Sequence, residues 1–195
     1  MPRPPRIVVP HGIYHVYSRG NRRQVICRDD GDRLFFFALF EIVVRKFEWV
    51  CHSYCLMPNH YHFLIETPRA NLSEGMQRFN GRYALSFNAR HGLDGHLFRG
   101  RFGATSVETT LHLTELSRYV VLNPVRAGLC DEAADWPWSS YRAYTGLAPR
   151  PAFLTVDLIL AQFGSDPALA ARRYAAFVAD LAPREVWSPR ATAGV

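Results

Sequence analysis

Two β-rich runs, Trp49 to Met57 and His60 to Thr67, are separated by only Pro58-Asn59. Such runs are typical of strands, and a Pro-Asn pair between them is typical of a tight turn. The simplest prediction is a β-hairpin, whose two strands must lie side by side and antiparallel. The remaining elements must therefore pack beside this hairpin or against one of its faces.

Two amphipathic helices flank the hairpin in the sequence. Asp29 to Lys46 begins with acidic capping residues and continues with apolar residues at helical spacing. Leu72 to His91 is a second such stretch, and further strands are expected within His11 to Ser18 and Phe98 to Val107. The order strand, helix, strand, strand, helix, strand predicts an α+β fold, a ferredoxin-like antiparallel or mixed sheet with flanking helices.

The second half of the chain reads as mainly helical. Helical periodicity covers Leu111 to Val125 and ends near Pro124, and an aromatic loop or short turn follows at Trp136 to Tyr141. Two small helices are expected at Leu154 to Phe163 and Asp166 to Leu181, with a frayed end over the last dozen residues. We divide the chain into a main domain, residues 1–146, and a helical C-terminal extension of unassigned role, residues 147–195.

The composition favours a soluble, basic protein of the cytoplasm. Apolar residues make up 48% of the chain, yet no apolar run approaches the roughly 18 residues that span a bilayer. No signal-peptide core follows the basic N-terminus. The net charge of +6 suits a polyanionic partner such as nucleic acid. Four scattered cysteines give no support for a disulfide framework or a zinc ribbon: Cys27, Cys51, Cys55 and Cys130.

The triplet His60-Tyr61-His62 lies inside one of the predicted hairpin strands. Residues two apart in a strand project from the same face, with Cα atoms about 6.6 Å apart. Two imidazoles so placed can bind one divalent cation. The alternative is a pair of unrelated histidines, one in the core and one on the surface.

Tyr119 and Asn123 lie four residues apart on the predicted third helix, and therefore on one helical face. The Asn123 amide oxygen suits Mg²⁺ or Mn²⁺ as a ligand. Four arginines near these positions can grip phosphate oxygens, although each can equally serve solubility: Arg99, Arg101, Arg118 and Arg126. Together the residues predict a metal-assisted attack of a tyrosine on DNA, which needs no nucleotide cofactor. The sequence indeed lacks a phosphate-binding P-loop motif.

Four segments resemble the signature blocks of the REP-associated tyrosine transposases, relatives of insertion-sequence transposases of the HUH single-tyrosine class. They occur in the expected order and lie within the stretch from His11 to Tyr144: Met57 to Leu64, Gly95 to Phe102, Arg118 to Gly128, and Trp136 to Tyr141. The resemblance implies a ferredoxin-like fold and residues 1–146 as the catalytic domain. It also implies single-stranded DNA and DNA hairpins as substrates.

The resemblance assigns roles to individual residues. His60 and His62 match the histidine pair that binds the divalent cation, and Tyr119 matches the nucleophile. Asn123 falls where the class places a polar third ligand. The resemblance is compatible with a monomer or a homodimer, and it implies a cytoplasmic, nucleoid-associated protein.

Three alternatives stay open. Tyr61 is a second phenol near the histidines, and only strand geometry argues against it as the nucleophile. A zinc hydrolase would use His60, His62 and a third ligand such as His52 or Glu66. A hairpin-binding protein with an idle site would bind DNA in a salt-sensitive manner without any covalent product.

Overall fold

The fold comes from a computed structural model, and the structure describes residues 8–180. Its first half runs β1 (Gly12–Arg19), α1 (Asp30–Phe47), β2 (Val50–Leu56), β3 (His60–Thr67), α2 (Leu72–His91) and β4 (Gly103–Ser106). The four strands form one antiparallel sheet in the order β2-β3-β1-β4. This βαββαβ arrangement confirms the predicted α+β, ferredoxin-like sheet with flanking helices, and every pairing in it is antiparallel.

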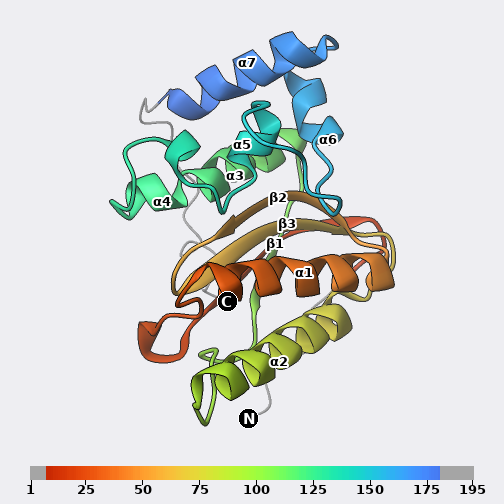
Figure 1. Cartoon of the computed structure of the whole chain (residues 1–195). Coiled ribbons are helices and arrows are strands. Elements are labelled where there is room, and N and C mark those ends of the chain that lie inside the picture. Colours follow the sequence, from red (N-terminus) through yellow and green to blue (C-terminus); the bar gives the residue numbers. More distant parts are fainter. Residues whose placement is uncertain (1–7, 181–195) are drawn as a thin grey trace.

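The sheet is covered on both faces (Figure 1). Helices α1 and α2 lie on one face, where aromatic rings of both helices pack against β3. Phe40 of α1 stacks on Phe63 with ring centroids 4.0 Å apart, and Phe79 of α2 contacts both rings. Because side chains alternate along a strand, a Phe63 that faces α1 requires the neighbouring His62 to face the other way.

Helix α3 (Thr110–Val121) covers the opposite face of the sheet, and its main contacts are with β2 and β3 (Figure 1). Thr109 begins the helix as its N-cap, because its hydroxyl accepts a hydrogen bond from the His112 amide. Leu113, Leu116 and Val120 are buried at helical spacing and anchor α3 to the sheet.

The remaining helices lie on the same side of the sheet as α3 (Figure 1). They are α4 (Asn123–Arg126), α5 (Tyr141–Tyr144), α6 (Asp157–Leu160) and α7 (Pro167–Ala179), with three-residue 3₁₀ turns between some of them. The described part of the C-terminal extension packs into the main core: Phe153 contacts Phe40, and Tyr174 of α7 stacks on Tyr144. No helix among residues 8–180 is long and apolar enough to cross a membrane.

Two predicted boundaries differ clearly from those of the structure, and one prediction falls on residues that the structure does not describe. The strand expected over Phe98 to Val107 is only four residues long, because β1 pairs with Gly103–Ser106 and Phe98 makes an isolated bridge to Gly20. The third helix ends at Val121, and Pro124 lies in the first turn of the separate helix α4. A proline is tolerated there, because the backbone N–H that it lacks would have no hydrogen-bond partner within the helix. The frayed end predicted for the last dozen residues lies outside the described part.

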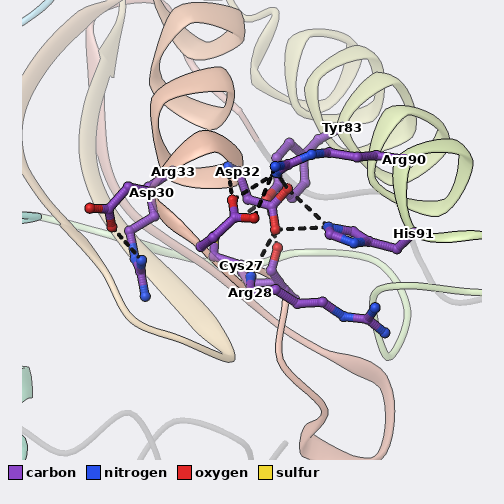
Figure 2. Close-up of polar contacts among 10 residues, drawn as sticks. Cys27, Arg28, Asp30, Asp32, Arg33, Tyr83, Arg90 and His91 are labelled. Atoms are coloured by element: carbon purple, nitrogen blue, oxygen red, sulfur yellow. Dashed lines mark hydrogen bonds and ion pairs between the residues drawn. The ribbon is translucent and has the colours of Figure 1, made fainter.

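A polar cluster joins the start of α1 to the end of α2 (Figure 2). The Asp32 carboxylate is 3% exposed, and it accepts a hydrogen bond from the Arg28 amide at 2.8 Å. It also contacts His91 Nε2 at 3.0 Å and the Arg90 guanidinium. Burial works against the charged carboxylate, but these hydrogen bonds outweigh it, and the pKa of Asp32 is lowered.

We expect Asp32→Ala to lower the free energy of unfolding by about 2 kcal/mol, because the Arg28 amide, Arg90 and His91 lose a shared acceptor. Asp30→Ala is the matched control in the same helical turn. Its ion pair with Arg33 is largely exposed on the Asp30 side, so the loss should be smaller. Urea unfolding at pH 7 measures both values, and equal losses would contradict the role given to Asp32.

The same cluster predicts a pH dependence. The folded-state pKa of Asp32 lies below its unfolded value, so its stabilising contribution is present above about pH 4. The contribution is lost as the pH falls through the folded-state pKa. The difference in stability between the original chain and Asp32→Ala should therefore shrink as the pH falls below about 4.

Candidate active site

The sheet face under α3 carries the histidines of the His-x-His triplet. In the register of β1 with β3, His60 lies opposite Arg19 and His62 lies opposite Tyr17. Residues opposite one another share a face, so Arg19 and Tyr17 project to the same side as the two histidines. The His60 and His62 rings are 5.1 Å apart and nearly perpendicular.

Helix α3 brings Tyr119 onto this histidine pair. Its ring meets the His62 ring edge-on, with centroids 5.7 Å apart and planes at 86°. Tyr119 is half-buried, and the Arg126 guanidinium lies over its outer face, with Cζ 4.9 Å from the ring centroid. Burial raises the pKa of Tyr119, while the positive charges of Arg126 and Arg19 act against that rise.

Asn123 stands one turn after Tyr119, at the junction of α3 and α4. Its amide nitrogen donates to two helix carbonyls, to Tyr119 at 2.8 Å and to Val120 at 3.2 Å. This fixes the amide so that its oxygen is the atom available to other groups. The Asn123 side chain also lies within hydrogen-bonding reach of His60, so the end of α3 lies beside β3.

Both histidines are held in the neutral form that binds metal ions. Burial, assisted by the charge of Arg19, lowers the pKa of His60 to about 4, against the opposing effect of its hydrogen bond to Asn123. Burial also lowers the pKa of His62 well below its usual value, as do the neighbouring His15, His60 and Arg19.

The hydrogen bonds of the two rings leave one nitrogen of each available as a ligand. His60 Nδ1 donates to the Asn59 side-chain oxygen at 2.6 Å, and His62 Nδ1 bonds His15 Nε2 at 2.9 Å. The remaining nitrogen of the neutral His60 ring therefore carries a lone pair, and its hydrogen bond to Asn123 forms only when the ring is protonated. A nitrogen lone pair beside an amide oxygen suits a cation that both can bind. Among residues 8–180 no three His, Cys, Asp or Glu side chains form a group that could hold a metal ion. A cation bound by His60 and His62 would need the Asn123 amide oxygen as its third donor.

Tyr61 is placed away from this site. It is fully buried on the α1 and α2 face, where its ring packs on Phe36 and Phe63. Its hydroxyl donates to the Asn80 side-chain oxygen at 2.7 Å. The position agrees with the strand alternation that argued against Tyr61 as the nucleophile.

The zinc-hydrolase alternative named His52 or Glu66 as a third ligand, and the structure places both away from His60 and His62. His52 and Glu66 pair with each other at 3.1 Å, near the far end of β3. Glu66 is four strand residues from His62, which is about 13 Å along the strand. Neither side chain can therefore share a metal ion with His60 and His62.

The four predicted DNA-binding arginines lie in different places. Arg126 lies over the Tyr119 ring. Arg99 is exposed beside the end of β1, where its backbone amide donates to the Arg19 carbonyl at 2.9 Å. Arg101 lines a groove of about 740 Å³ beside α2, together with Gln77 and Asn80. Arg118 is only 3% exposed, and its side chain turns toward α7.

The contacts of Arg118 explain its burial. Its guanidinium pairs with Glu115 at 2.9 Å, donates to the Asp180 carbonyl at 3.0 Å and stacks on the Phe177 ring. The Arg118 guanidinium is therefore engaged in contacts on the side of α3 that faces α7. We therefore exclude Arg118 from the residues proposed to bind phosphate.

Sequence reasoning missed three residues of this site: His15, Tyr17 and Arg19 of β1. Their spacing of two places them on one face of a predicted strand, and this was a usable signal. The face and the neighbour, however, depend on the register of β1 with β3, which pairs residues about 45 positions apart in the chain. Local sequence patterns carry no information on that register.

Two solved structures are similar to this chain. A solved REP-associated tyrosine transposase bound to a REP hairpin is similar with a TM-score of 0.64 and 19% identity, over 81% of this chain and 93% of that one. A putative transposase from Deinococcus radiodurans R1 is similar with a TM-score of 0.41 and 14% identity, over 62% of this chain and 95% of that one. No curated protein sequence matches significantly.

At this identity the first structure supports the fold alone, and the second is too distant in shape to support even that. The family evidence comes from the sequence. Residues 8–123, more than half of the chain, match the family described as "Transposase IS200 like". The matched range ends at Asn123 and includes β1, the hairpin and all of α3. The chain therefore belongs to the family of IS200-like transposases.

Proposed function

We propose that the chain is a divalent-metal-dependent enzyme that nicks single-stranded DNA and transfers the strand through a covalent bond to Tyr119. The observation that carries the proposal is the contact of Tyr119 with His62, one helical turn from the Asn123 oxygen that faces His60. A phenol and two neutral imidazoles, brought together from α3 and β3, form a site for nucleophilic attack.

In the proposed reaction the Tyr119 oxygen gives up its proton and attacks the scissile phosphorus. A phosphotyrosine bond forms, the bond from phosphorus to the leaving strand oxygen breaks, and that oxygen takes a proton to become a free hydroxyl. One phosphoester replaces another, so the enzyme can reverse the step on a second DNA end. His60, His62 and Asn123 would hold Mg²⁺ or Mn²⁺, which supplies Lewis-acid stabilisation of the phosphate charge.

Two arginines assist the proposed nucleophile. A tyrosine has an ordinary pKa near 10, and burial raises that of Tyr119 further. Arg126 and Arg19 counter this rise and stabilise the phenolate. Both arginines are exposed, so their guanidinium groups can also donate hydrogen bonds to the oxygens of a DNA phosphate.

The DNA partner is proposed to be a hairpin with an unpaired flank. The solved transposase of similar fold is bound to a REP hairpin, and the present chain has a net charge of +6. We propose exposed Arg99, next to Arg19 of β1, and exposed Arg101, in the groove beside α2, as contacts to DNA phosphates. We propose that the enzyme works on chromosomal DNA in the cytoplasm.

The test is incubation with a labelled DNA hairpin that carries single-stranded flanks, in Mg²⁺ or Mn²⁺. A labelled protein band that survives a denaturing gel supports the transesterase. Hairpin binding without such a band, under either metal ion, would favour a binding protein with an idle site.

The arginine positions predict different effects on DNA binding. We expect Arg99→Ala and Arg101→Ala each to reduce the slope of log affinity against log salt by about 0.7, the value for one lost contact to a single strand. Arg118→Ala should leave this slope unchanged and should lower the melting temperature, since its guanidinium holds α7 to α3. Salt titrations by fluorescence anisotropy measure the slopes, and a reduced slope for Arg118→Ala would contradict its placement.

A further inference from the structure

His15 of β1 lies directly behind the proposed metal ligand His62. Its side chain is fully buried, and its Nε2 atom is 2.9 Å from His62 Nδ1. The two rings are nearly parallel, with an angle of 13° and centroids 5.1 Å apart. Its directly opposite residue on β3 is Leu64, so His15 reaches His62 diagonally across the strand pair.

The hydrogen bond determines which nitrogen of His62 is available. Two ring nitrogens at this distance need one proton between them, so one ring donates and the other accepts. If His62 Nδ1 donates to His15, the lone pair of His62 lies on Nε2, where a cation can bind. Metal-binding histidines generally give their other ring nitrogen to such a partner, which fixes both the ring orientation and the tautomer.

His15 also contacts the proposed nucleophile. The Tyr119 ring meets the His15 ring edge-on, with centroids 5.9 Å apart and planes at 82°. The same phenol ring contacts His62 at 5.7 Å. One buried side chain of β1 therefore touches both a proposed cation ligand and the attacking tyrosine.

An imidazole is a costly choice for a position that only fills the core. A buried polar ring needs hydrogen-bonding partners, whereas an aromatic hydrocarbon of similar size needs none. Phenylalanine already fills comparable places on the other face of the sheet, as Phe63 does. A nitrogen at position 15 has a specific use here, because it faces His62 Nδ1.

We propose that His15 is a positioning residue that holds His62 in the tautomer and orientation required for binding a divalent cation, and that supports the Tyr119 ring above it. The inference rests on the proposed metal-dependent function. It assigns a task to a residue outside the His-x-His triplet and outside α3.

The experiment compares Mn²⁺ binding by three variants of the full chain with that of the original chain. His15→Phe keeps a ring and removes the nitrogen. His15→Gln restores an acceptor near the place of the imidazole Nε2 atom. His52→Phe is the matched control, because His52 is also buried in this sheet but pairs with Glu66, away from the site. Free Mn²⁺ is followed by electron paramagnetic resonance, and melting temperatures report on folding.

We expect His15→Phe to weaken Mn²⁺ binding by about 10- to 100-fold, the usual effect of losing the partner of a metal-bound histidine. His15→Gln should recover most of the loss, and His52→Phe should stay within about twofold of the original chain. A folded His15→Phe that binds Mn²⁺ as the original does would overturn the inference. If that variant does not fold, a folded His15→Gln with 100-fold weaker binding would overturn it, because a retained acceptor would then not matter.

The covalent-product assay separates this inference from the proposed function. If Mn²⁺ binding depends on His15 and no DNA adduct forms, the positioning role stands and the nicking function fails. If the adduct forms and His15→Phe binds Mn²⁺ as tightly as the original chain does, the proposed function stands and the positioning role fails. An original chain that binds no Mn²⁺ would overturn the positioning role.

Discussion

Replacing Tyr119 by phenylalanine should abolish the covalent DNA product, with a fall in rate of at least about 10⁴-fold, as for other enzymes that lose their nucleophile. The change removes one oxygen and leaves the ring that packs on His15 and His62. Folding and hairpin affinity should therefore stay close to those of the original chain. Gel analysis of the adduct and anisotropy binding, on the same preparations, measure the two quantities.

Two other phenylalanine substitutions are the controls. Tyr17→Phe removes a half-buried phenol whose ring is 6.1 Å from His62, and Tyr61→Phe removes the buried phenol inside the His-x-His triplet. Both variants should still form the adduct. An adduct that persists in Tyr119→Phe and disappears in either control would show that another phenol attacks the DNA.

The second large effect concerns the proposed metal site. We expect His60→Ala to lower the rate of adduct formation by about 10²- to 10⁴-fold, since the charge on the attacked phosphate loses its stabilisation. Removing divalent ions from the original chain with EDTA should have a comparable effect, and added Mg²⁺ or Mn²⁺ should reverse it. Hairpin binding should change little, because arginine contacts to phosphate provide most of the affinity.

His96→Ala is the matched control for His60, because His96 is exposed in the loop that follows α2. It should keep both the rate and the metal dependence of the original chain. Full activity of the original chain in EDTA, or full activity of His60→Ala, would contradict a metal site at the triplet. A similar loss in His96→Ala would indicate a general sensitivity to histidine removal.

The regular elements could be predicted because their sequences carry strong local signals. A helical apolar pattern followed by Gly92 predicts Leu72–His91 with the bounds that α2 has. The β-rich run His60–Thr67 has the bounds of β3, and strand alternation places Tyr61 on the opposite face from the histidines. The order of strands and helices along the chain predicted the α+β fold class, while the strand order β2-β3-β1-β4 and the antiparallel direction of every pairing come from the structure.

What could not be predicted depends on contacts between distant segments. The burial of Arg118 requires α7, whose Phe177 lies 59 residues further along the chain. The role proposed for His15 requires the register of β1 with β3, and the groove beside Arg101 requires α2 to lie against residues 100–102. Each of these depends on tertiary packing that a local pattern does not encode.

The role of Tyr119 as nucleophile is tested directly by identifying the residue that becomes attached to DNA. After reaction with a short labelled hairpin, nuclease treatment and trypsin digestion, mass spectrometry locates the attached nucleotide. Trypsin releases Tyr119 to Arg126 as a peptide with a single tyrosine, while Tyr17 and Tyr61 fall on other peptides. We expect a nucleotide on the Tyr119 peptide. A nucleotide found only on a peptide that contains Tyr17 or Tyr61 would contradict it.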